Sequence, residues 1–358
     1  MAWGEAELER LRARYADDPG GRMHDRKFAR VAERVFSRGA RPAPYVGVPT
    51  FLTAPFRQVD PGSPDFSGLD VAISGVPMDL GAGNRAGTRF GPRAIRTIER
   101  VGPYHHVLDV APIHDLRVAD VGDVPFSSRY DIAASHREIE AWTAAQVAQG
   151  VVPLSVGGDH SITCPILRAV GRGRPVGLVH IDAHSDTGGP FDGLRENHGA
   201  PFRNAVLAGV LDPTRTIQIG LRGASEYLYE FATESGMTCI HAEEVDLLGI
   251  PAIIAKAREV VGEGPVYVSF DIDSLDPAFA PGTGTPEIGG LSSREVQAIL
   301  RGLAGIDIVG GDVVEVAPAY DATTNTAHAG GQMLFEILSL VAVSPRFRGG
   351  EGERSARG

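Results

Sequence analysis

The chain has 358 residues and a formal net charge of −11, from 34 Lys and Arg against 45 Asp and Glu. This acidic balance argues against a nucleic-acid or anionic-membrane surface and mildly favours cationic ligands. Its two cysteines fit no metal or redox spacing, no apolar run approaches 18 residues and the first residues are charged and amphipathic, so we expect a soluble cytoplasmic protein.

In chain order, residues 1–69 come first and are expected to form an N-terminal arm. They contain two short helix candidates, at 5–15 and 25–36, and then a coil marked by prolines. One hypothesis is that this arm packs on a neighbouring subunit. At the other end, residues 344–358 have too few apolar side chains to pack, so we expect a disordered tail.

Residues 70–343 repeat a pattern of strand, turn and helix without an internal linker, which predicts one α/β domain. Runs such as 176–181 are nearly all apolar, as is typical of parallel strands buried on both faces. The predicted strands are 71–76, 116–121, 151–156, 176–182, 216–221, 237–241, 266–273 and 306–316. The predicted helices are 133–148, 201–208, 250–261, 293–303 and 324–340.

Three short clusters of aspartate and histidine follow predicted strands. The first cluster contains His160, the second contains Asp182, His184 and Asp186, and the third contains Asp271 and Asp273. Side chains two residues apart on an extended segment lie on the same side. Ligands of α/β sheets bind at the carboxyl ends of the strands, so the six side chains are predicted to converge. Asp159 precedes His160 and is expected to orient the turn.

The types of side chain in these clusters narrow the choice of metal. A single Asp or His at a strand end is more often a cap or a solvated loop residue, but six together favour a metal site. Four carboxylates and two imidazoles without cysteine suit hard divalent ions, chiefly manganese. Two such ions about 3.5–4 Å apart can share one water and lower its pKa toward ~7. The sequence therefore predicts a two-metal hydrolytic site.

These segments resemble the signatures of the ureohydrolases, the arginase and agmatinase superfamily. The matching stretches are GGDHS from Gly157, DAHSD from Asp182 and SFDIDSLDPAFAPGTGTPEIGGL from Ser269. GVPMDLGAGNRAGTRFGPRAIR from Gly75 and DVVEVAPAYD from Asp312 are similar to the agmatinase-like branch. The resemblance implies a three-layer arginase-like α/β fold with an eight-stranded, mainly parallel sheet, two manganese ions per subunit, and hydrolysis of a guanidino group to an amine and urea. Nickel is an alternative metal.

The resemblance also implies roles for single residues. One ion would be held by His160, Asp182, Asp186 and Asp271, and the other by Asp182, His184, Asp271 and Asp273. His198 would relay protons, Glu315 would receive the guanidinium, and Asp186 would hydrogen-bond the nucleophile and then the leaving nitrogen. Asn84 and Arg85 would line the mouth of the substrate pocket. Relatives commonly form trimers or hexamers, so a homo-oligomer is expected.

The small-molecule substrate is open at its distal end. Agmatine is favoured slightly by overall resemblance, and Asp192 or Glu196 would attract its ammonium group. A guanidino acid such as guanidinobutanoate, attracted by Arg85 or Arg195, is the alternative, and a smaller guanidine compound is another. A non-catalytic regulatory homologue is a further hypothesis, against which the complete set of six ligands argues.

Overall fold

The computed structural model describes residues 4–16, 23–36, 45–99, 101–223 and 226–348. The chain divides into two compact units, Met1–Ala43 and Pro44–Gly358. The first contains the helices α1 (Glu5–Tyr15) and α2 (Arg26–Phe36), which confirms both helix predictions there. The second unit begins before residue 70, because Phe51, Leu52 and Phe66 are buried in its core. Most of the expected tail, residues 349–358, lies outside the described residues.

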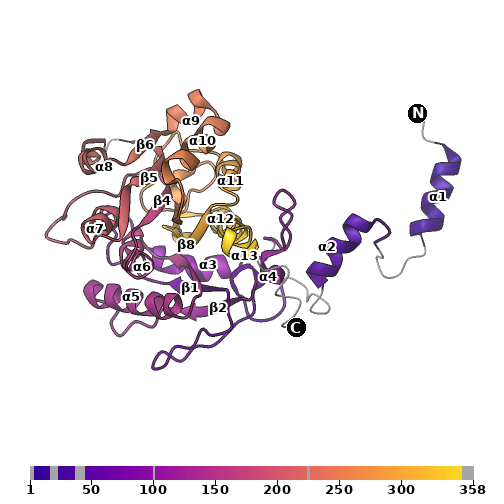
Figure 1. Cartoon of the computed structure of the whole chain (residues 1–358), viewed down its shortest axis with the longest axis horizontal. Coiled ribbons are helices and arrows are strands. Elements are labelled where there is room, and N and C mark those ends of the chain that lie inside the picture. The colour runs from indigo at the N-terminus through magenta and orange to yellow at the C-terminus, as the bar shows by residue number, and fades with distance from the viewer. Residues whose placement is uncertain (1–3, 17–22, 37–44, 100, 224–225, 349–358) are drawn as a thin grey trace. The chain divides into compact units, whose positions relative to one another are not determined.

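A single eight-stranded sheet forms the centre of the second unit (Figure 1). The strand order is β2-β1-β3-β8-β7-β4-β5-β6, and every pairing between these strands is parallel. The predicted α/β fold and its eight strands are therefore confirmed. The strands are β1 (Val71–Val76), β2 (Val118–Asp123), β3 (Val152–Gly157), β4 (Val176–Ile181), β5 (Leu211–Leu221), β6 (Thr238–His241), β7 (Pro265–Asp271) and β8 (Asp307–Val314).

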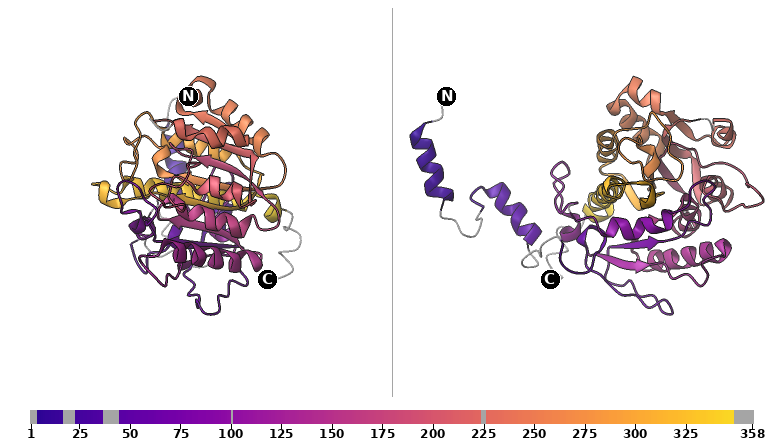
Figure 2. Two further views of the ribbon diagram at one scale, coloured as in Figure 1. Left: turned by 90° about the vertical axis from the view of Figure 1, so that its left-hand side faces the viewer. Right: turned by 180° about the vertical axis from the view of Figure 1, so that it is seen from behind.

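Helices cover both faces of the sheet and complete three layers (Figures 1 and 2). One face packs against α5 (Ile132–Ala148), α6 (Thr163–Val170), α7 (Pro201–Leu207) and α8 (Glu230–Ser235). The other packs against α3 (Gly91–Arg96), α4 (Pro112–Asp115), α9 (Ala242–Leu248), α10 (Ile250–Val261), α11 (Ser293–Gly302) and α12 (Asn325–Ala342). A short helix, α13 (Pro345–Arg348), follows α12. None of the described helices is long and apolar enough to span a membrane.

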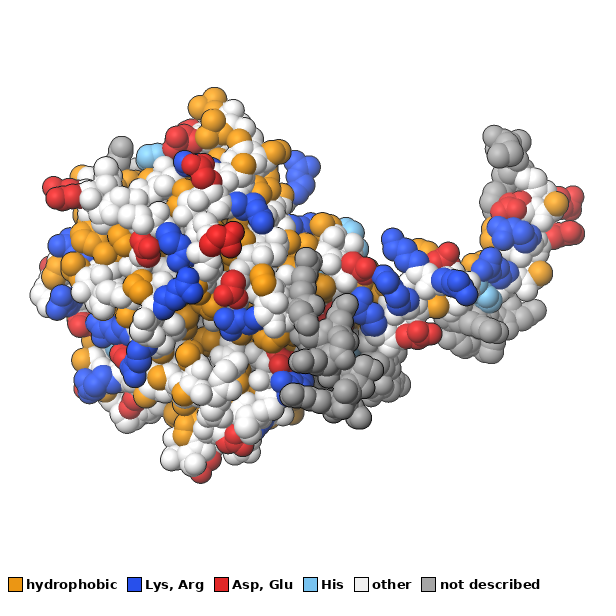
Figure 3. Space-filling view, viewed as in Figure 1, with side chains coloured by type: hydrophobic (Ala, Val, Ile, Leu, Met, Phe, Trp, Pro, Cys, Tyr) orange, Lys and Arg blue, Asp and Glu red, His pale blue; other side chains and the backbone are white. Residues whose placement is uncertain are grey.

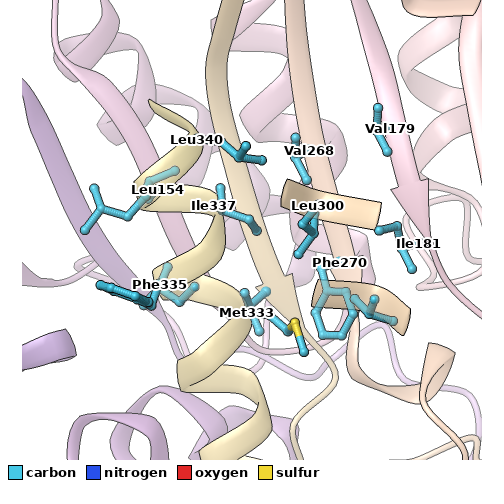
Figure 4. Packing of buried hydrophobic residues seen from close by; sticks show 14 of the residues in the cluster. Leu154, Val179, Ile181, Val268, Phe270, Leu300, Met333, Phe335, Ile337 and Leu340 are labelled. Carbon is cyan, nitrogen blue, oxygen red and sulfur yellow. The ribbon is translucent and has the colours of Figure 1, made fainter. Parts of the chain in front are cut away.

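Alternation along the strands explains why the sheet is buried on both sides. In β4, Val179 and Ile181 belong to the core on the face that α10 and α12 cover, whereas Leu178 belongs to the core on the opposite face. Figure 4 shows Met333 and Ile337 of α12 lying against the sheet on the first of these faces. Each large apolar side chain buried in this way contributes about 1.5–3 kcal/mol. This double burial accounts for the nearly continuous apolar runs in the sequence.

The strand order determines where the site forms. β3, β8, β7 and β4 are neighbours at the middle of the sheet, although they come from distant parts of the chain. Ile181 pairs with Phe270, and Asp271 pairs with Val314. The segments that follow these four strands therefore begin side by side at one edge of the sheet.

Candidate active site

His160 lies among three of the predicted carboxylate ligands. It opens a 3₁₀ turn directly after β3, and its Nδ1 atom is 3.1 Å from Asp182 Oδ2, 3.0 Å from Asp186 Oδ2 and 3.2 Å from Asp271 Oδ2. Although these oxygens are close, this buried Nδ1 makes no hydrogen bond of regular geometry within the described residues. Carboxylates packed this closely repel one another unless a positive charge lies between them. An imidazole lone pair facing several carboxylate oxygens is a donor set that fits a divalent cation.

His184 forms the second half of the cluster. Its Nδ1 atom is 3.5 Å from Asp182 Oδ1 and 3.2 Å from Asp273 Oδ2. Asp182 thus presents one oxygen to each histidine, as a bridging ligand would, and Asp182, His184 and Asp273 form one of the groups able to hold a metal ion. The structure therefore brings all six predicted ligands together, in two overlapping groups.

The pKa values in the cluster are shifted so that protons are retained, which adds positive charge among the carboxylates. Burial, reinforced by Asp273 and Asp182, raises the pKa of Asp271 well above its usual range. Burial lowers the pKa of His160, but the three neighbouring carboxylates outweigh burial and raise it well above its ordinary value. In the absence of a metal ion, protons on His160 and Asp271 reduce the repulsion between the neighbouring carboxylates. Two divalent ions would replace those protons, so the residues fit a binuclear metal centre.

His180 is a contributor that the sequence analysis missed. It is buried within β4, and its Nε2 atom lies 2.7 Å from Asp182 Oδ2. Gln218 Nε2 lies 3.0 Å from the other ring nitrogen, so His180 Nε2 carries the proton and donates to Asp182. The only signal in the sequence was a histidine inside an otherwise apolar strand. His180 orients Asp182 from behind.

Glu315 and His198 lie together beside the cluster. Glu315 Oε1 accepts the backbone N–H of His160 at 2.9 Å and lies 3.0 Å from His198 Nδ1. In the neutral form of His198, Nδ1 carries the proton, because the backbone N–H of Gly83 donates to Nε2 at 3.0 Å. Burial lowers the pKa of His198, but the hydrogen bond and charge of Glu315 raise it to about 9.

The clustered residues surround a cavity of about 120 Å³. Its lining residues are His184, Ser185, Asp186, Gly188, His198, Gly199, Leu228, Asp271, Asp273, Thr285 and Glu315. The predicted metal ligands Asp186, Asp271 and Asp273 thus share one cavity with Glu315 and His198. Asp159 is buried next to the cluster and does not line this cavity. Its carboxylate accepts hydrogen bonds from the N–H groups of Gly81 and Ser161, so it orients the turn at His160–Ile162 as expected.

Asn84 and Arg85 connect two loops beside the site. Both donate to the carbonyl of Gly284, and Arg85 also donates to Thr283 O and lies over the Tyr320 ring at 4.5 Å. Neither is among the residues that line the cavity. Their contact with substrate stays a prediction, and the contact that they make here joins the loop 81–91 to the segment after β7.

A buried group of aspartates and histidines at the carboxyl edge of a parallel α/β sheet is the arrangement expected of a metal-dependent hydrolase. The family model of the arginase family matches residues 69–339, and the chain belongs to that family. It is therefore a ureohydrolase, a member of a family of enzymes that cleave C–N bonds of guanidino compounds.

Comparison with individual proteins supports the same assignment. The guanidinopropionase of Pseudomonas aeruginosa is 50% identical, and the match covers 84% of this chain and 93% of that protein. The mitochondrial agmatinase of Gallus gallus is 46% identical, with 84% and 87% covered. The structure of proclavaminate amidino hydrolase from Streptomyces clavuligerus gives a TM-score of 0.79 at 38% identity, covering 84% of this chain and 99% of that one. Trypanosoma cruzi formiminoglutamase with Mn²⁺ gives 0.70 at 26% identity, covering 77% and 95%.

Proposed function

We propose that this enzyme hydrolyses the guanidino group of a short guanidino carboxylic acid, releasing urea and the corresponding amino acid, with two manganese ions per subunit. One water molecule is consumed, the bond between the guanidino carbon and the substituted nitrogen breaks, and that nitrogen leaves protonated. The observation that carries the choice of an acid is the guanidinium of Arg203, which lines a cavity beside the active site and has no hydrogen bond or ion pair among the described residues.

The metal ligands in this proposal are the six residues of the cluster. His160, Asp182, Asp186 and Asp271 would hold one ion, and Asp182, His184, Asp271 and Asp273 the other. When bound, two such ions supply Lewis-acid activation of the attacking water. A donor set of four carboxylates and two imidazoles suits manganese. The similar structure of Trypanosoma cruzi formiminoglutamase, which was solved with Mn²⁺, supports this choice of metal. Nickel is the alternative to test.

Glu315 and His198 have complementary roles in this proposal. Glu315 is a buried acid on the cavity wall, so it attracts the guanidinium and orients its central carbon. His198 shares that wall, and its side chain keeps 21% of its surface exposed. It can therefore pass a proton from solvent to the nitrogen that leaves. Asp186, on the same wall, is placed to hydrogen-bond the attacking water.

The distal end of the substrate is assigned to a second cavity. This space, of about 220 Å³, shares Gly188 and Leu228 with the active-site cavity and is also lined by Arg203. The Arg203 guanidinium lies 5.1 Å from the Phe231 ring centre. Within the described residues it has no hydrogen bond or ion pair. A free guanidinium binds a carboxylate in a bidentate manner, and the similarity to guanidinopropionase supports the same substrate class.

Agmatine is the second candidate, because acidic side chains share the second cavity. Glu230 and Glu234 line it together with Arg203, and either is able to receive an ammonium group. The similarity to an agmatinase supports this reading. Arg85, Arg195, Asp192 and Glu196, the groups expected from the sequence to read the distal end, line neither cavity.

A urea-release assay separates these candidates. We expect kcat/KM for 3-guanidinopropanoate or 4-guanidinobutanoate to exceed that for agmatine, with Mn²⁺ and Ni²⁺ compared in separate preparations. Arg203→Ala should lower kcat/KM for the acid roughly 10- to 100-fold, since a charge-assisted contact contributes about 1.5–3 kcal/mol. Arg195→Ala, at an exposed position outside both cavities, is the matched control. Preference for agmatine would overturn the choice of an acid, and an unaffected Arg203→Ala variant would remove Arg203 from recognition.

A further inference from the structure

Asp312 is a buried acid whose presence the fold alone does not explain. It lies in β8 and is fully buried. No ion pair joins it to a cationic side chain in the part of the chain that the structure describes. Burying an unpaired carboxylate costs several kcal/mol unless hydrogen bonds offset the loss of water. The hydrogen-bond partners that offset this cost therefore indicate what Asp312 does.

Three hydroxyl groups converge on Asp312. Its Oδ2 atom accepts from Thr163 Oγ1 at 2.7 Å and from Tyr267 OH at 2.8 Å. Its Oδ1 atom accepts from Ser269 Oγ at 2.7 Å. Ser269 and Asp312 are paired across β7 and β8, and Thr163 comes from α6. The two contacts to Oδ2 hold the carboxyl group in place, so Oδ1 has a fixed direction.

Ser269 connects this acid to the metal-binding cluster. Its Oγ atom also lies 2.8 Å from His160 Nε2. A serine hydroxyl has a single proton, and that proton is directed to Asp312. Ser269 can therefore only accept from His160, so Nε2 carries the imidazole proton. Nδ1 is then the nitrogen left to bind a metal ion, and Nδ1 is the atom that faces Asp182, Asp186 and Asp271.

We propose that Asp312 is a positioning residue of the metal centre: acting through Ser269 Oγ, it holds His160 with Nε2 protonated and Nδ1 directed toward the metal-binding carboxylates. This inference rests on the proposed metal site, because it assigns a role toward that site. Partners that orient a ligating histidine commonly change metal affinity 10- to 100-fold when removed.

The effect should be confined to one of the two ions. Among the described residues, His184, the imidazole assigned to the other ion, has no comparable partner, and its Nε2 atom lies 3.7 Å from Glu287 Oε1. Loss of Asp312 is therefore expected to weaken the ion bound through His160 and to leave the ion bound through His184 near its original affinity.

The test is a Mn²⁺ titration of the metal-free, full-length protein, with the metal content measured after dialysis. In Asp312→Asn, one side chain oxygen becomes an NH₂ group that cannot accept, so the residue can no longer serve both Ser269 and the other two hydroxyls. We expect one ion to bind 10- to 100-fold more weakly and the other to change by less than about threefold. Ser269→Ala should give the same asymmetric loss, and Ser269→Thr, which keeps the hydroxyl, should restore tight binding.

Thr163→Val is the matched control, because it removes a contact to Asp312 but leaves the branch through Ser269 intact. Thermal unfolding of each metal-free variant checks folding, and if Asp312→Asn fails to fold, the two Ser269 variants decide. Wild-type affinity for both ions in Asp312→Asn or Ser269→Ala would overturn the proposal, as would equal weakening of both ions. Failure of the wild-type protein to bind two ions would instead contradict the proposed function.

Discussion

Asp186 and Glu315 lie in the active-site cavity with backbone conformations that non-glycine residues rarely adopt. Their φ angles are 51° and 62°, in the left-handed region, where each such residue costs about 1–3 kcal/mol. Backbone hydrogen bonds hold both in place: Phe202 N–H donates to Asp186 O, and Glu315 N–H donates to Gly158 O. The surrounding structure thus retains strain at two residues that line the cavity.

The charge of Glu315 can be tested by Glu315→Gln. The amide oxygen can still accept from His160 N–H and from His198, so the variant should keep its fold and both metals. Loss of the negative charge should lower kcat/KM for a guanidino substrate roughly 10- to 100-fold. It should also shift the titration of His198 to lower pH, because Glu315 is what raises the pKa of His198 to about 9. Steady-state kinetics and histidine NMR measure the two effects, and unchanged values in both would show that Glu315 has another role.

At the scale of elements, predictions from the sequence succeeded where one element carries a long pattern. All eight strands and helices such as α5 and α12 were predicted because their apolar periodicity extends over a whole element. Six shorter helices were not: α3, α4, α6, α8, α9 and α13 have four to eight residues. About two turns or fewer give little periodicity by which to distinguish a helix from a loop, although α7, with seven residues, was predicted. Tertiary packing stabilises such short helices.

The contact between α5 and the turn after β3 predicts an acid-sensitive element. His136 on α5 is buried, with its Nε2 atom 3.1 Å from Ser161 Oγ. Burial, assisted by Arg168, lowers the pKa of His136 to about 4. As the pH falls from 6.5 to 4, the unfolded chain takes up a proton that the folded chain does not, so stability falls by roughly 3 kcal/mol. His136→Gln should lose this part of the pH dependence, as measured by denaturant unfolding at pH 7 and pH 5. An identical pH dependence in both proteins would show that other groups dominate.

The site depends on the fold of the whole domain, because it joins residues that are distant in the sequence. His160 and Glu315, for example, are hydrogen-bonded although they are 155 residues apart. Sequence reasoning predicted that the three clusters meet, since parallel strands end at one edge. It could not predict the strand order, which inserts β8 and β7 between β3 and β4. It also missed His180 and Asp312, because a polar side chain inside an apolar strand has no partner that can be seen in the sequence. On the larger unit in Figure 3, acidic and basic side chains are interspersed.

The whole fold should depend on the metal, with a pH dependence of defined sign. In the metal-free protein, neighbouring carboxylates raise the pKa of His160 and of His184, in spite of burial, and burial raises that of Asp271. The folded state then binds more protons than the unfolded state, so the stability of the metal-free protein should fall as the pH rises above 6.5. Chelator-treated protein should therefore melt at a lower temperature at pH 9 than at pH 6, and adding Mn²⁺ should raise the melting temperature most at pH 9. Metal binding should also release protons, which calorimetry in buffers of different ionisation enthalpy measures. A metal-free protein whose melting temperature rises with pH, or Mn²⁺ binding without proton release, would contradict a cluster held together by protons in place of cations.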